Sequence, residues 1–278
     1  MLSPLTRSRL IALLLAVAVA APILYAVFVH HGKFVRIWGG ATLATVWAVQ
    51  FARDRLALRR EPAGDPARGL TVFVEPISFL CIKWGLRQFA LAASLAGVQG
   101  RVERFVWSTG WRAFFAIPDL MSQGRNLRHA QRLADRLAAF RGEQPSAPIR
   151  LVTYSGGGYI ALEALRRLPP GVRVERVTLL VSSVSSGYDL GPSLAVCDRI
   201  VNVCSPLDCF INGFGIWVLG TSDRRHRLAA GMIGFRAPPG SADRLVQVRW
   251  RPEFVRHFWF GGHMTLSSVP MVAELLKL

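Results

Sequence analysis

The sequence predicts an α/β fold, a mainly parallel sheet of about six strands flanked by helices, preceded by an N-terminal transmembrane helix or helical hairpin. Two observations support this prediction. After residue 70, short runs rich in β-branched and aromatic residues alternate with longer helix-like segments, as parallel strands and their crossovers require. Before residue 60, an uncharged apolar run of about twenty residues has the length of a membrane span.

The first element expected along the chain is a membrane span from Leu10 to Val29, which follows two arginines. With a rise of about 1.5 Å per residue, a helix of this length crosses the hydrocarbon core of a bilayer. A second apolar stretch, Ile37–Ala52, predicts another span within residues 34–52. Residues 1–60 are therefore interpreted as a membrane anchor.

The distribution of basic residues around the second stretch predicts the side of the membrane. Only Lys33 and Arg36 lie in the short loop before it. Four arginines follow it, namely Arg53, Arg55, Arg59 and Arg60. Because cytoplasmic flanks carry the excess of basic residues, we expect an inner-membrane hairpin and a cytoplasmic domain after it. The alternatives are a single span with an interfacial second helix and an external domain, or a cleaved signal peptide, which the length disfavours.

Residues 61–69, EPAGDPARG, predict a linker to one domain over residues 70–278. Six strands are expected in this domain, at Leu70–Glu75, Val102–Trp107, Ile149–Tyr154, Val174–Val181, Arg199–Val203 and Leu245–Trp250. Helices are expected at Phe79–Val98, Asn126–Phe140 and Tyr159–Leu168. The first of these helices is apolar enough that a third membrane span is its alternative.

Composition restricts the classes of partner. The formal net charge is +17, and the basic residues, mostly arginine, are scattered along the chain without a dense block. We therefore expect no nucleic-acid partner, whereas an anionic lipid surface or an acidic partner is compatible with the dispersed charge. The four cysteines lack the paired short spacings of zinc sites and disulfide frameworks, so no metal or other cofactor is expected.

The segment Thr153–Gly158, TYSGGG, lies between a predicted strand and a predicted helix. Ser155 would occupy the tight turn, where small neighbours are needed because strand and helix approach closely. This arrangement resembles the nucleophile elbow of the α/β-hydrolases, although Thr153 stands where that family usually has glycine. A phosphate-binding loop is the alternative, but the Lys-Ser or Lys-Thr of such loops does not follow.

The resemblance implies a catalytic triad in the order serine, acid, histidine, which the sequence offers as Ser155, Asp208 and His263. Competing residues are Asp189 for the acid, and His226 and His257 for the base. The family also implies an oxyanion hole built from two backbone N–H groups. Its candidate residues are Gly156, Ile77 and Ser78, without the histidine-glycine dipeptide often found in that loop. The segment Cys209–Pro239 is expected to be either a lid over the site or a surface helix.

The resulting interpretation is a membrane-anchored serine hydrolase that cleaves a small-molecule or lipid carboxylic ester through an acyl-enzyme. One alternative is a non-catalytic membrane-associated scaffold that keeps the fold. The other is an acyltransferase that uses the same triad. The sequence predicts neither the acyl group nor the oligomeric state.

Overall fold

The computed structural model describes residues 45, 64–77, 86–108, 116–241 and 243–278. The chain divides between Arg59 and Arg60, and apart from residue 45 the described residues belong to the C-terminal unit. Apart from that residue, both predicted membrane spans, 10–29 and 34–52, lie outside the described residues. Within the described part of the chain, no helix is both long and apolar enough to cross a membrane.

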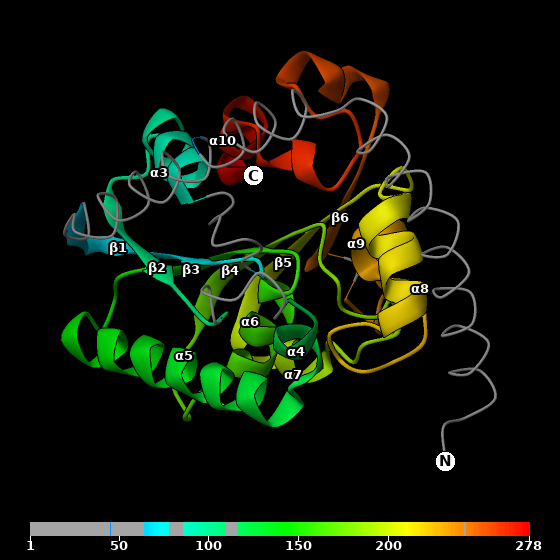
Figure 1. The fold of residues 1–278 in the computed structure, drawn as a ribbon. Coiled ribbons are helices and arrows are strands. Elements are labelled where there is room, and N and C mark those ends of the chain that lie inside the picture. The colour runs from blue at the N-terminus through cyan, green and yellow to red at the C-terminus, as the bar shows by residue number, and fades with distance from the viewer. Residues whose placement is uncertain (1–44, 46–63, 78–85, 109–115, 242) are drawn as a thin grey trace, which may run out of the picture. The chain divides into compact units, whose positions relative to one another are not determined.

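Six strands form one sheet in the order β2-β1-β3-β4-β5-β6, and every neighbouring pair is parallel (Figure 1). The strands are β1 (Asp65–Val74), β2 (Gly100–Phe105), β3 (Ile149–Tyr154), β4 (Val174–Leu180), β5 (Cys197–Cys204) and β6 (Leu245–Arg249). The prediction of an α/β fold with a parallel six-stranded sheet is confirmed.

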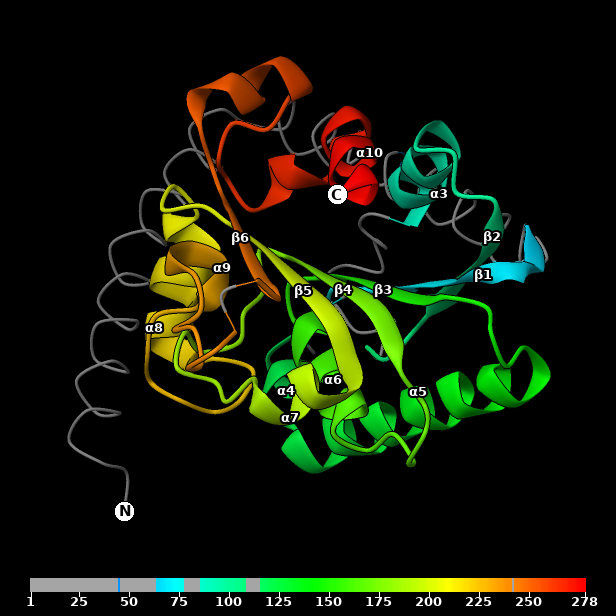
Figure 2. The ribbon, with the colours of Figure 1, turned by 180° about the vertical axis from the view of Figure 1, so that it is seen from behind.

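Helices cover both faces of the sheet, because a parallel sheet exposes apolar side chains on each face. One face carries α3 (Leu86–Leu95) and α10 (Val269–Lys277). The other carries α5 (Gln123–Glu143), α6 (Gly157–Leu165) and α7 (Gly191–Val196). Figures 1 and 2 show these two helical layers on opposite sides of the strands.

Strand β1 contributes side chains to the hydrophobic core on both faces of the sheet. Its last six residues are all buried. Val72 and Val74 pack in the core under α5 and α6, whereas Phe73 packs in the core under α3 and α10. The ring of Phe73 stacks on Phe89 of α3, with ring centroids 4.6 Å apart. Since successive side chains of a strand point to opposite faces, an unbroken apolar run indicates a strand covered on both sides.

The second strand ends earlier than the sequence predicts. The predicted strand reached Trp107, but β2 ends at Phe105. Trp107 leaves the strand and donates its indole N–H to the backbone oxygen of Glu75, at 2.6 Å. This buried hydrogen bond holds the end of β1 against the segment that follows β2, and it satisfies the indole donor.

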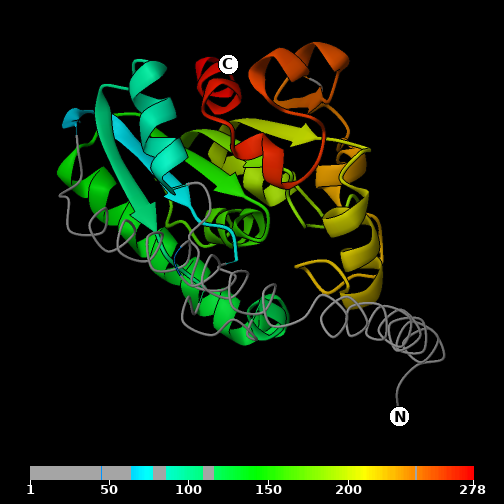
Figure 3. The same ribbon diagram turned by 45° about the horizontal axis from the view of Figure 1, so that its top comes forward.

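Several short elements lie outside the predicted helices, and three of them fall within Cys209–Pro239, the segment expected to be a lid or a surface helix. After β2 comes α4 (Ala116–Met121), and after β5 come a π-helical turn η1 (Cys209–Gly215), α8 (Ile216–Leu219) and α9 (Ala230–Ile233). After β6 come two 3₁₀ turns, η2 (Pro252–His257) and η3 (Met264–Ser267), and then α10. The yellow segment after β5 and the orange segment after β6 lie at the same end of the sheet (Figures 1 and 3).

Candidate active site

Ser155 lies in the turn between the end of β3 and the start of α6. Its φ of 53° is in the left-handed region, which a residue with a side chain rarely adopts. The turn is held at both ends, because the Ser155 N–H donates to the Leu180 oxygen at 2.9 Å and the Ser155 oxygen accepts from the Gly158 N–H at 3.1 Å. A partly exposed hydroxyl is thereby fixed at the carboxyl end of the sheet.

The glycines after Ser155 allow strand and helix to approach. A Cβ at Gly157 would lie 2.6 Å from the Glu75 oxygen, and a Cβ at Gly158 would lie 2.3 Å from the Ser182 hydroxyl oxygen. Side chains at these two positions would therefore collide with β1 and with the segment after β4. Thr153, two positions before the serine, is fully buried, and its hydroxyl oxygen has no hydrogen-bond partner among the described residues.

The turn lies where the winding of the sheet changes direction. Strand β1 has β2 on one side and β3 on the other, so the connections leaving β1 and β3 diverge. In open parallel sheets, ligands bind at such a point beside the carboxyl ends of the strands. Ile77 follows β1, and its side chain lies 3.2 Å from the position of a Cβ on Gly156. Ser78, the other oxyanion candidate in this loop, lies outside the described residues.

Asp208 and His263 form a buried pair. The Nδ1 atom of His263 lies 2.6 Å from the Oδ2 atom of Asp208, and the two residues are 7% and 1% exposed. Asp208 follows β5 and His263 follows β6, so two neighbouring strands deliver the pair to one edge of the sheet. A carboxylate bound to Nδ1 leaves Nε2 as the nitrogen that can exchange a proton with another group.

Tyr154 connects this pair to the serine turn. Its hydroxyl donates to the backbone oxygen of His263. Its ring also meets the imidazole edge to face, with centroids 5.6 Å apart and an interplanar angle of 80°. Because Tyr154 directly precedes Ser155, these contacts link the loop that carries His263 to the serine turn. No hydrogen bond between Ser155 and His263 is shown among the described residues.

The competing residues lie in other environments. Asp189 pairs with Arg166 at 3.1 Å, and its side chain is 67% exposed. His226 is exposed, and Nε2 of His257 lies 3.1 Å from the Nε atom of Arg256. None of the three is shown in a contact with Asp208 or His263 in the described structure, so the geometry favours the Asp208–His263 pair.

Asn212 was not identified from the sequence, although it makes three hydrogen bonds at the site. Its Nδ2 donates to Oδ2 of Asp208 at 2.7 Å and to the Val181 oxygen at 2.9 Å. Its backbone N–H donates to Oδ1 of Asp208 at 3.3 Å. The fully buried Asn212 thus fixes the carboxylate that contacts the imidazole. The usable sequence signal was its position four residues after Asp208, within reach of a capping carboxylate.

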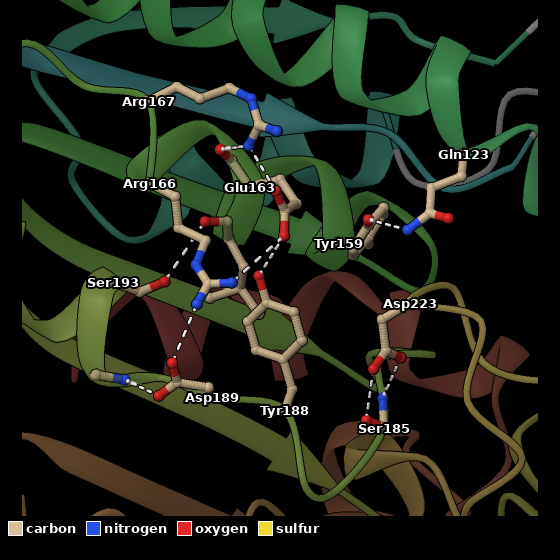
Figure 4. A network of polar contacts seen from close by, with 12 residues as sticks. Gln123, Tyr159, Glu163, Arg166, Arg167, Ser185, Tyr188, Asp189, Ser193 and Asp223 are labelled. Atoms are coloured by element: carbon tan, nitrogen blue, oxygen red, sulfur yellow. Dashed lines mark hydrogen bonds and ion pairs between the residues drawn. The ribbon is translucent and has the colours of Figure 1, made fainter.

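A second buried polar network stiffens α6 behind the serine turn (Figure 4). Glu163 of α6 accepts from the Tyr188 hydroxyl at 2.7 Å and pairs with Arg167. The guanidinium of Arg166 lies over the Tyr188 ring, 5.3 Å from its centroid. Burial, followed by the hydrogen bond to the Glu163 carboxylate, raises the pKa of Tyr188. The network ties the loop after β4 to the helix that begins at the serine turn.

Exposed apolar side chains flank the Asp208–His263 pair on both loops. Leu207 and Phe210 beside Asp208 are 48% and 76% exposed. Phe258 and Phe260, on the loop before His263, are 61% and 55% exposed. The two loops touch, because a Cβ on Gly261 would lie 2.6 Å from a methyl carbon of Leu207. We call these four residues the apolar rim.

Comparisons with known proteins give structural neighbours only. No family model and no curated protein matches the chain. A cutinase of Trichoderma reesei, solved with a phosphonate inhibitor, is similar at 13% identity over 90% of both chains, with a TM-score of 0.38. A cutinase-like protein of Cryptococcus sp. is similar at 14% identity over 78% of this chain and 95% of its own, with a TM-score of 0.38. The catalytic core of acetyl xylan esterase from Trichoderma reesei is similar at 14% identity over 75% of this chain and 98% of its own, with a TM-score of 0.40.

Proposed function

We propose that the domain is a serine hydrolase of carboxylic esters. Ser155 is the nucleophile, His263 is the general base, and Asp208 orients the imidazole. The observation that carries the proposal is the buried 2.6 Å contact between Asp208 and His263, in a loop that Tyr154 links to a serine in a left-handed turn. A strained serine and a buried carboxylate–imidazole pair at the same sheet edge are typical of acyl transfer through a serine.

In the first half of the proposed reaction, Nε2 of His263 takes the proton of the Ser155 hydroxyl as Oγ attacks the ester carbonyl carbon. The buried Asp208 carboxylate stabilises the imidazolium that forms. The tetrahedral intermediate then collapses, the bond to the leaving oxygen breaks, and the imidazolium protonates that oxygen. The products of this half are an alcohol and an acyl-enzyme on Ser155.

In the second half, water gives a proton to His263 and attacks the acyl carbon, which releases the acid and restores the Ser155 hydroxyl. The negative oxygen of both tetrahedral intermediates needs hydrogen-bond donors. The N–H of Gly156 lies at the N-terminus of α6, where backbone donors lack intrahelical partners. Ile77 packs against Gly156, so the loop over Ile77 and Ser78 is the proposed source of the second donor.

The apolar rim supports an ester with an apolar acyl or alcohol part. Leu207, Phe210, Phe258 and Phe260 expose large side chains next to the residues that carry the reaction. Exposed apolar patches on a protein mark surfaces that contact apolar ligands or lipids. A lipid ester suits the rim and the proposed membrane anchor, which rests on the apolar runs at residues 10–29 and 34–52.

A fluorophosphonate probe tests the serine assignment on the full chain. The wild type is expected to be labelled, and Ser155→Ala is expected to lose the label because the reactive oxygen is removed. Ser146→Ala is the matched control, since Ser146 is exposed just before β3 and should leave labelling unchanged. Equal labelling of wild type and Ser155→Ala would contradict the proposal, and an unlabelled but folded wild type would favour the non-catalytic scaffold.

The proposed cytoplasmic position of the domain has its own test. Green fluorescent protein or alkaline phosphatase would be fused after Leu278, since the former fluoresces in the cytoplasm and the latter is active only outside it. A fluorescent, phosphatase-negative pair is the expected result. The opposite pattern would support the single span with an external domain.

A further inference from the structure

A groove of about 670 Å³ opens at the amino ends of the strands, at the edge of the sheet opposite to Ser155. Its wall combines the start of β1, the turn before β2, the starts of β3 and β4, and the end of α10. The charged side chains in this wall are Arg68, Arg150, Glu175, Arg176 and Lys277. Four cations and one carboxylate therefore line the groove, and no proposed catalytic residue does.

The strand register places like charges side by side in this region. Arg150 of β3 is in register with Arg176 of β4, which is in register with Arg199 of β5. In-register residues of adjacent strands point to the same face, with backbones about 4.8 Å apart. Like charges in such positions repel each other, so the row needs negative charge nearby.

Nearby carboxylates neutralise only part of the positive charge of the row Arg150, Arg176 and Arg199. Glu175 receives two hydrogen bonds from Arg150, at 2.8 and 3.1 Å. No contact between Arg176 and a carboxylate is shown among the described residues, and its Nη2 donates to the Leu276 oxygen at 2.8 Å. Burial first, and then the neighbouring charge of Arg150, lowers the pKa of Arg176. A partly buried cation is thus held beside another cation, and the nearby Glu175 carboxylate, which acts to raise the pKa of Arg176, offsets only part of the effect of burial and repulsion.

Capping of α10 accounts for part of this arrangement. Arg176 and Arg199 donate to the oxygens of Leu276 and Leu278, at the C-terminal end of the helix, where positive charge is favourable. Each of these bonds uses one of the five N–H donors of a guanidinium. Capping therefore explains the position of Arg176, but it does not account for Arg68 and Lys277 on other walls of the groove. These two cations lie 3.7 and 2.8 Å from the carboxylates of Asp65 and Glu274, in ion pairs whose side chains are about half exposed and therefore weakly held.

We propose that this groove binds a phosphate group, with Arg176 and Arg150 as its central ligands and Arg68 and Lys277 at its edges. Guanidinium groups match the geometry of phosphate oxygens and bind them through paired, charge-assisted hydrogen bonds. The phosphate can belong to a lipid headgroup or to a soluble molecule.

Isothermal titration calorimetry on the full chain in a non-ionic detergent tests the proposal. The ligands are inorganic phosphate, glycerol 1-phosphate and dihexanoyl phosphatidic acid, each titrated at constant ionic strength with chloride. The wild type should bind the phosphate group, and Arg176→Gln should weaken binding at least tenfold because it removes a charged donor. Arg132→Gln is the matched control, since Arg132 is exposed on α5 across the sheet, and should stay within twofold of wild type.

The three ligands distinguish the sources of phosphate. Tighter binding of dihexanoyl phosphatidic acid than of the two soluble phosphates supports a lipid headgroup, and equal or tighter binding of the soluble phosphates supports a soluble ligand. Failure of all three to bind the wild type would overturn the proposal. So would equal affinities for wild type and Arg176→Gln.

Two further variants keep the test decisive. Arg176 also donates to the Leu276 oxygen, so its substitution could destabilise the fold. The double variant Arg68→Gln, Lys277→Gln avoids this problem, because the two side chains are 59% and 51% exposed. It should also weaken phosphate binding severalfold. Ser155→Ala should bind phosphate as the wild type does. Loss of esterase activity and loss of phosphate binding are then separate results. Unchanged phosphate affinity in the double variant would exclude Arg68 and Lys277 as ligands and contradict the proposal that the groove binds phosphate.

Discussion

Charged side chains are held differently at the carboxyl ends and at the amino ends of the parallel strands, called here the carboxyl edge and the amino edge of the sheet. At the carboxyl edge, Asp208 and His263 are buried, contact each other, and are further fixed by Asn212. At the amino edge, Arg150 and Glu175 form an ion pair whose side chains are 34% and 41% exposed. Buried charge depends on its specific partners, whereas exposed charge is screened by water and salt. Substitutions should therefore have large effects at the carboxyl edge and small ones at the amino edge.

The largest effect is expected for Asp208→Asn. The amide keeps the shape of the side chain but removes the charge that stabilises the imidazolium, so kcat/KM for an ester should fall on the order of 10⁴-fold. Steady-state hydrolysis of a p-nitrophenyl ester measures the loss. Asp189→Asn, which changes an exposed ion pair with Arg166, is the control and should keep activity within a few-fold.

Asn212→Ala should have the next largest effect, because it removes a donor to the charged Asp208 carboxylate. A hydrogen bond to a charged group contributes about 1.5–3 kcal/mol, so a loss of about 10- to 100-fold in kcat/KM is expected. Without this donor the carboxylate is held less firmly against the imidazole, so the loss should appear mainly in kcat rather than in KM.

The control for Asn212 is Asn126→Ala, which removes a buried amide from α5. It should lower the thermal midpoint without lowering kcat. Unchanged kcat in Asn212→Ala, with loss of stability alone, would reduce Asn212 to a structural residue and weaken the contrast between the edges.

Gly157→Ala should destabilise the fold by about 1–3 kcal/mol, because its Cβ would lie 2.6 Å from the backbone oxygen of Glu75. Denaturant unfolding measures this loss. Gly142→Ala, near the end of α5, places a Cβ with no atom within 4 Å and should stabilise the chain by about 0.5–1 kcal/mol. Equal stabilities of the two variants would show that the approach of α6 to β1 is not constrained.

The last effect is confined to alkaline pH and is expected at the amino edge, for Cys197 at the start of β5. Burial raises the pKa of its thiol to about 12 from an ordinary value of 9.0. The unfolded chain therefore loses this proton first, so its contribution to stability is present below pH 9 and is lost as pH rises toward 12, by at most about 1.4 kcal/mol per pH unit.

Cys197→Ala should make the alkaline decline in unfolding free energy less steep, measured by denaturant titrations between pH 8 and 11. Cys209→Ala, which changes an exposed thiol, should leave the slope as it is in the wild type. A slope that is equal in both variants would indicate that other buried groups, such as Tyr188, determine the alkaline limit.

The strands of the sheet were predictable because each one corresponds to a short local run of apolar and β-branched residues. The run Ile149–Tyr154 is apolar enough to be identified by itself, and the structure gives β3 the same bounds. The short helices after β5 and β6 were missed because they depend on contacts with distant residues. Helix α10, for example, is nine residues long and packs on α3. Isolated helices of this length are marginal in water, so local propensity does not reveal them.

The three candidate catalytic residues could be predicted from the sequence, but the residues that hold them in place could not. Serine, acid and histidine follow three strands of the parallel sheet, β3, β5 and β6, so their order indicates convergence at one edge. Their catalytic roles stay predictions. The sequence could not reveal that Asn212 contacts Val181, 31 residues away, or that Tyr154 contacts His263, 109 residues away. Such contacts depend on how loops fold back over the sheet.

The hydrogen bond from Tyr154 to the His263 backbone has a mechanical consequence. It joins the base-carrying loop to the strand end that leads into the nucleophile, and Tyr154 is buried. A displacement of the long segment after β6 would therefore pull on the residue next to the nucleophile. The loop that carries the base and the turn that carries the serine are coupled through this one buried side chain.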